Sequence, residues 1–188
     1  IKAMADASFY LQSANQAQSA AAAADWAWDT FWDGQNLQRI HRNGSTRITG
    51  FLEDYAYFCE ALIALYRISR NKEYLTKAEI LLNRAIELFY DNNTQQLAFT
   101  PNNGEQLFYL KCDLNDDVTP SPNASLATAL YQLGQYHHNT TFTELSYTLI
   151  AQVSKTMTNS PGWYFHWCKL AQAQTLGGCH VTFYACSS

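Results

Sequence analysis

In the stretch Gly50-Phe51-Leu52-Glu53-Asp54-Tyr55-Ala56, two carboxylates stand at the start of a long apolar pattern. Apolar residues then recur at three- and four-residue spacing, which predicts a helix over residues 52–69 with one strongly apolar side. Glu53 and Asp54 therefore fall in its first turn. Carboxylates there are favoured by the helix dipole and accept hydrogen bonds from free backbone N–H groups. The pair is either an N-terminal cap or part of a site.

Six further helices are predicted around this one, over residues 1–11, 15–32, 73–90, 123–136, 142–157 and 162–176. The links after the first, third and fifth helices are short, and those after the second and fourth are long. Antiparallel hairpins place connections of one kind on one face, so the N-termini of the third, fifth and seventh helices point to a common functional face. Their low charge predicts that these three helices form the inner layer of an all-α double layer.

Short strand-like pieces are predicted in the long loops. Residues 37–42 alternate like a strand before the turn Asn43-Gly44. Residues 96–100 and 106–112 flank a second turn at 101–104, and residues 180–185 are compatible with a strand in the tail. The predicted fold is therefore all-α, built from antiparallel helical hairpins, with small strand fragments at the functional face.

Composition excludes several classes of protein. The chain of 188 residues has a net charge of −4 and scattered basic residues, which argues against nucleic acid or anionic membrane as the partner. It contains no apolar run of the roughly 20 residues that span a bilayer, and residues 1–11 lack a signal-peptide layout. Its five cysteines are odd in number and form no zinc pattern, which predicts free thiols and a cytoplasmic setting. We expect neither metal nor cofactor.

Asp54 is the stronger candidate of the two carboxylates for a catalytic role. Glu53 and Asp54 lie about 100° apart around a helix, so one of them faces the inside. The apolar residues Phe58, Leu62 and Leu65 continue the side of Asp54. Asp117 or Asn123 would arrive from the neighbouring inner helix. A partly desolvated carboxylate near another acid is expected to have a raised pKa and to act as general acid or base.

Two segments also resemble a known family. Phe51-Leu52-Glu53-Asp54-Tyr55-Ala56 and Asp117-Val118-Thr119-Pro120-Ser121-Pro122-Asn123 are similar to C-terminal motifs of the YyaL-like family, bacterial relatives of spermatogenesis-associated, thioredoxin-domain-containing proteins. The resemblance extends from residue 1 to about 176. Pro122 stands where the family usually has glycine, which requires a loop without positive φ at that position.

The resemblance implies a fold and the extent of the domain. Relatives of this kind, with N-acylglucosamine 2-epimerases and six-hairpin glycosidases, form an (α/α)6 toroid. Residues 1–188 would then be one domain, a C-terminal portion of the toroid without the N-terminal thioredoxin-like domain and the first hairpins. A partial ring exposes apolar edges, which favours either a homodimer through the open edge or instability.

The same resemblance implies carbohydrate binding or catalysis, as a sugar epimerase, isomerase or glycosidase-like enzyme. The candidate catalytic residues are Asp54, Glu53, Asp117 and His166. The candidate substrate-binding residues are His41, Arg42, Tyr55, Asp116, Ser121, Asn123 and Trp163, and Tyr109 is a further aromatic candidate for stacking on a sugar ring.

The alternative is a non-catalytic helical scaffold or interaction domain. In that case Glu53 and Asp54 cap the third helix, and the polar residues from Asp116 to Asn123 cap the fifth. A lone histidine on an apolar helix, such as His166, is more often structural than catalytic.

Overall fold

The computed structural model describes residues 1–102 and 111–177. The described chain is mostly helical (67%), with seven helices and two small antiparallel hairpins. The helices are α1 (Lys2–Leu11), α2 (Ala14–Phe31), α3 (Leu52–Ser69), α4 (Glu73–Phe89), α5 (Pro122–His137), α6 (Thr140–Asn159) and α7 (Phe165–Leu176), and the 3-10 turn Pro161–Trp163 precedes α7. All seven predicted helices are confirmed, with ends that differ from the predicted ones by a few residues.

Helices α1, α3 and α5 end in the same way. Each is followed by a residue in the left-handed conformation, namely Gln12, Arg70 and His138. A left-handed residue at this position lets a backbone N–H bond back to the last turn and reverses the chain within two or three residues. The three short links therefore each close a helical hairpin, as predicted.

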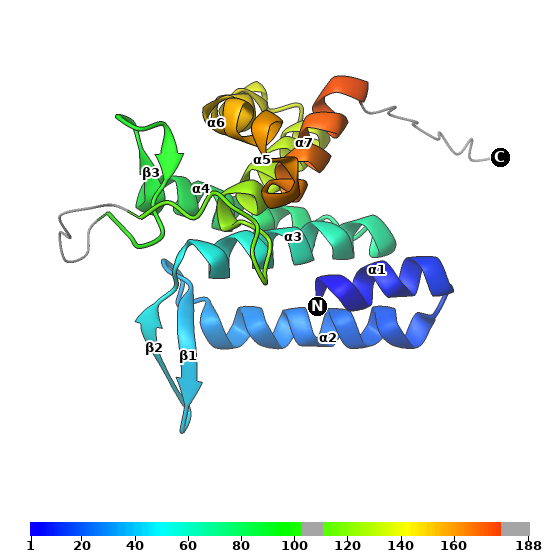
Figure 1. The fold of residues 1–188 in the computed structure, drawn as a ribbon. Coiled ribbons are helices and arrows are strands. Elements are labelled where there is room, and N and C mark those ends of the chain that lie inside the picture. Colours follow the sequence, from blue (N-terminus) through cyan, green and yellow to red (C-terminus); the bar gives the residue numbers. More distant parts are fainter. Residues whose placement is uncertain (103–110, 178–188) are drawn as a thin grey trace.

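The centre of the molecule is α3. It packs against α1, α2, α4 and α5, and α5 in turn packs against α6 and α7. Figure 1 shows the α1–α2 hairpin on one side of α3 and the group α5, α6 and α7 on the other. The apolar core follows this arrangement, with fully buried leucines on α3, α4 and α5 such as Leu62, Leu82 and Leu130.

The burial of the helices confirms one part of the predicted layering and corrects another. Helix α5 buries eleven of its 16 residues, whereas α4 buries eight of 17. Helix α7 buries only Trp167 and Leu170. The expectation of a seventh helix buried on most sides is wrong for the described residues, because α7 packs mainly on α5 and α6, reaches α3 through His166 and leaves Phe165 exposed.

Two hairpins interrupt the helices. Strands β1 (Gln38–Arg42) and β2 (Ser45–Thr49) pair antiparallel around Asn43 and Gly44, both with positive φ, as an Asn-Gly hairpin turn requires. Strands β3 (Tyr90–Asp91) and β4 (Gln96–Leu97) form the second hairpin. The predicted strand at 106–112 lies largely, and the one at 180–185 entirely, outside the described residues.

The structure tests part of the predictions on the cysteines and on membrane-spanning helices. Cys59 and Cys168 are free thiols, as predicted. For the other three cysteines the prediction stands untested, and Cys179 and Cys186 lie outside the described residues. No helix in the described part of the chain is long and apolar enough to cross a bilayer.

Candidate functional site

A polar cleft of about 320 Å³ lies between four helices that are not consecutive in the chain. Its lining comes from α1, α3, α5 and α7 alone: Lys2, Asp6, Tyr10, Glu60, Ala64, Arg67, Thr128, Tyr131, Gln132, His166, Lys169, Leu170 and Ala173. Each helix contributes residues three or four positions apart, which is one stripe of a helical surface. We call this region the Glu60–His166 cleft.

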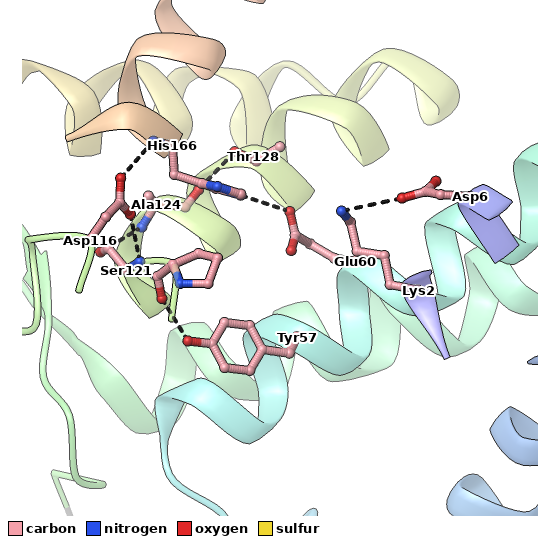
Figure 2. A network of polar contacts seen from close by, with 10 residues as sticks. Lys2, Asp6, Tyr57, Glu60, Asp116, Ser121, Ala124, Thr128 and His166 are labelled. Atoms are coloured by element: carbon pink, nitrogen blue, oxygen red, sulfur yellow. Dashed lines mark hydrogen bonds and ion pairs between the residues drawn. The ribbon is translucent and has the colours of Figure 1, made fainter. Parts of the chain in front are cut away.

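The cleft takes its name from a buried carboxylate and an imidazole that face each other across it. His166 Nε2 lies 3.4 Å from Glu60 Oε1, and the two side chains are 14% and 8% exposed (Figure 2). Glu60 is the only charged residue among the buried polar residues of the described chain. A buried carboxyl group is costly unless it has a polar partner, and the His166 imidazole supplies one for Glu60. A carboxylate and an imidazole in contact can also exchange a proton with a bound molecule.

The connection before α5 positions His166. Asp116 Oδ2 accepts a hydrogen bond from the His166 backbone N–H at 2.7 Å, and Asp116 Oδ1 accepts one from the Ser121 N–H at 2.8 Å. One carboxylate therefore ties the N-termini of α5 and α7 together, as Figure 2 shows. The favourable charge of a carboxylate at a helix N-terminus adds to these bonds. Tyr57 of α3 holds the same connection by donating to the Pro120 carbonyl at 2.6 Å.

The structure brings Asp116, Ser121, Trp163 and His166 together through hydrogen bonds of Asp116. Of these four, only His166 lines the cleft. Ser121 is the N-cap of α5 and accepts from the Ala124 N–H, and Pro122 follows as the first helical residue, where its fixed φ is suited to the helix. The Asp116 N–H donates to the carbonyl of Trp163, whose side chain is 60% exposed.

Asn123 has no exposed surface. Its Oδ1 accepts from the Leu97 N–H at 3.1 Å, and its Nδ2 donates to the carbonyls of Leu97 at 3.0 Å and Asp113 at 3.3 Å. The side chain therefore joins β4 to the start of α5. The polar atoms of Ser121 and Asn123 serve backbone groups, which is the structural role that the sequence left open.

Glu53 and Asp54 lie outside the cleft and share one cation. Arg39 Nη1 lies 2.7 Å from Glu53 Oε1 and 2.8 Å from Asp54 Oδ2. Asp54 Oδ2 also accepts from the Phe51 N–H at 2.8 Å, so Asp54 caps α3. Asp54 and Arg39 line a second cavity of about 450 Å³ between the start of α1, the end of α2, β1 and α3.

Burial is the largest influence on the pKa of Asp54. It raises the pKa of this carboxyl above its ordinary value of 3.8, although the Phe51 N–H and the Arg39 charge oppose the change. The raised pKa of Arg39 is due first to its hydrogen bond with Glu53. Arg39 therefore has two carboxylate partners at nearly equal distances, and burial outweighs this cation in the titration of Asp54.

We expect Asp54→Asn to change the pH dependence of stability. Because the folded chain binds the Asp54 proton more tightly than the unfolded chain does, the contribution of Asp54 is present at low pH and is lost as the pH rises through the window above 3.8. The free energy of unfolding of wild type, minus that of Asp54→Asn, should therefore decrease between about pH 3 and about pH 6. Urea unfolding at several pH values measures it.

Asp91→Asn is a control of opposite sign. Backbone hydrogen bonding by Asn93 lowers the pKa of Asp91, so the advantage of wild type over this variant should grow as the pH rises through the window below 3.8. If the wild-type advantage over Asp54→Asn also grows, the ion pair with Arg39 outweighs burial and our account of Asp54 is wrong.

The remaining predicted site residues lie elsewhere. His41 and Arg42 are exposed on β1, and the His41 ring contacts those of Trp26 and Phe31 at centroid distances of 6.4 Å. Tyr55 is fully buried, and its hydroxyl accepts from the Leu37 N–H. Asp117 is exposed on the connection before α5. Tyr109 lies outside the described residues.

Sequence reasoning missed most of the cleft. Glu60 is a single carboxylate within the apolar run from Tyr55 to Tyr66, and a charge on the apolar side of a helix is a signal for a partnered or functional group. Lys2, Arg67 and Lys169 carry no such signal, because charged residues on a helix usually face solvent. Only the packing of the four helices places them around Glu60.

Among the described residues, no three histidine, cysteine, aspartate or glutamate side chains are grouped so as to hold a metal ion. Neither a protein-family model nor a curated protein sequence matches this chain.

Proposed function

We propose that this chain is a C-terminal portion of an (α/α)6 toroid of the YyaL-like kind and that it binds a sugar-like ligand in the Glu60–His166 cleft. The observation that carries the proposal is the lining of the cleft, which comes from α1, α3, α5 and α7 and from no other helix. Alternate helices line the inside of a ring of helical hairpins. Four such helices correspond to the concave face of an incomplete ring, with α2, α4 and α6 outside.

The cleft has the chemistry that a polyhydroxylated molecule needs. Gln132 and Thr128 carry polar side chains at its wall, and Glu60 is a strong acceptor for hydroxyl groups. Tyr10 lines the cleft with an exposed ring, which can stack on the apolar face of a sugar. Most of the lining residues carry polar or charged side chains, so the cleft offers many hydrogen-bonding groups to a ligand rich in hydroxyls.

Within this proposal, Glu60 and His166 take the acid/base role that the sequence placed on Asp54. When His166 carries its proton on Nε2, that group donates to Glu60 and leaves Nδ1 as the basic nitrogen. Epimerisation, isomerisation and glycoside hydrolysis all require such transfer of a proton. Asp116 would be a positioning residue, because it holds the backbone of His166 and does not line the cleft.

Ligand-observed NMR with neutral and acidic monosaccharides tests the proposal. We expect at least one sugar to bind with a Kd of about 10 mM or tighter, and Glu60→Gln and His166→Gln each to weaken it about tenfold or more, as loss of a hydrogen bond to a charged group would. Glu144→Gln, which removes an exposed carboxylate from α6, is the matched control and should bind as wild type does. If no sugar binds wild type, or if all three variants bind equally, the cleft is not the site.

A non-catalytic scaffold is the second proposal, and a specific observation favours it. Asp116, Ser121 and Asn123 all use their polar side-chain atoms for backbone groups, so this predicted cluster serves stability. Exposed apolar residues on the two end helices, Phe9 and Leu11 on α1 and Phe165 on α7, support the expected homodimer through the open edge. If a sugar binds and none of its carbon-bound hydrogens exchanges with solvent, the non-catalytic scaffold would be favoured.

A further inference from the structure

The Glu60–His166 cleft carries more positive than negative side chains. Its cations are Lys2, Arg67 and Lys169, and its carboxylates are Asp6 and Glu60. The whole chain has a net charge of −4, so the cleft differs in sign from the average of the molecule. A cavity lined by an excess of one charge attracts ligands of the opposite charge.

The ion pairs inside the cleft show which cation is in excess. Asp6 is shared by two of them, at 3.5 Å from Lys2 Nζ and 3.9 Å from Arg67 Nη1. Glu60 faces His166. Lys169 forms no ion pair within the part of the chain that the structure describes, and it lies one helical turn after His166 on the same stripe of α7.

We propose that the ligand of this cleft is a sugar that bears an anionic group, a carboxylate or a phosphate, and that Lys169 and Arg67 bind this group. The inference rests on the proposed function and adds the substrate class. Lys169 is the uncompensated cation, and Arg67 is held to Asp6 only at the limit of an ion pair, so its guanidinium is available to an incoming anion. The anionic group would then place the sugar hydroxyls beside Glu60 and His166.

Matched pairs of ligands test the inference on the full chain. Calorimetry at low salt would compare the affinities of D-glucuronate and D-glucose 6-phosphate with that of D-glucose. Acetate is the control for the carboxylate of glucuronate, and inorganic phosphate is the control for the phosphate of glucose 6-phosphate. We expect one of the acidic sugars to bind about tenfold more tightly than glucose, because a hydrogen bond to a charged group is stronger than a neutral one. This preference should weaken when salt is raised to about 0.5 M.

Charge variants then assign the preference to the cleft. Lys169→Gln and Arg67→Gln should each reduce the preference for the acidic sugar at least threefold, and Lys169→Arg should keep it. Lys155→Gln is the matched control, because Lys155 is an exposed lysine on α6. Far-ultraviolet circular dichroism confirms that each variant is folded before binding is compared.

Each outcome is decisive. A preference for glucuronate alone identifies a carboxylate, and a preference for glucose 6-phosphate alone identifies a phosphate. Glucose binding as tightly as both acidic sugars overturns the inference and leaves the proposed function standing. If acetate or inorganic phosphate binds as tightly as the corresponding acidic sugar, the ligand need not be a sugar and the proposed substrate class is overturned. If the preference for the acidic sugar survives Lys169→Gln and Arg67→Gln, the role of these two cations is overturned. If no sugar binds at all, the proposed function itself fails.

Discussion

Trp167→Ala will lower the free energy of unfolding by about 3 to 5 kcal/mol, the usual cost of removing a large buried aromatic side chain. Trp167 has no exposed surface, and it is one of only two buried residues of α7. Its Nε1–H donates to the Leu114 carbonyl at 2.8 Å, so the variant also leaves a backbone acceptor without its partner. Equilibrium unfolding in urea, with the slope compared between variants, measures the effect.

Two variants make this test specific. Trp167→Phe keeps the ring volume in part and loses the hydrogen bond, so it should cost less, about 1 to 2 kcal/mol. Trp163→Ala removes a tryptophan four residues earlier that is 60% exposed, and it should change stability by less than about 0.5 kcal/mol. Equal costs for the two alanine variants would contradict the packing of α7 described above, and with it the placement of His166.

The second large effect is expected at Asn123. Asn123→Ala leaves the Leu97 N–H and the carbonyls of Leu97 and Asp113 without this partner. A buried polar group that loses its partner costs about 1 to 3 kcal/mol, so the variant should lose about 3 kcal/mol or more. Thermal and urea unfolding both measure this loss of stability. Asn15→Ala, at an exposed position on α2, is the control and should change the free energy of unfolding by less than about 0.5 kcal/mol.

This experiment also decides between the two roles of Asn123. The sequence predicted a substrate-binding residue, and the structure places its amide against backbone groups. If Asn123→Ala loses less than about 1 kcal/mol and abolishes sugar binding, the residue serves the ligand and our structural account is wrong.

The helices and their caps follow from the sequence by itself. The apolar spacing after Phe51 predicted α3, and the Asn43-Gly44 pair predicted the β1–β2 hairpin. The carboxylates in the first turn of the third helix and the polar run before the fifth predicted caps, and Asp54 and Ser121 serve as caps. These features are encoded within a few neighbouring residues, because backbone conformation and capping depend on local hydrogen bonds and side-chain periodicity.

The tertiary structure alone decided the cleft. The residues that line it are far apart in the sequence, as Lys2, Glu60, Tyr131 and Lys169 show. No local pattern relates such residues, since their approach depends on how α1, α3, α5 and α7 pack. The same reason explains the error for α7. Its low charge was visible in the sequence, whereas the number of neighbours that cover a helix depends on the elements around it.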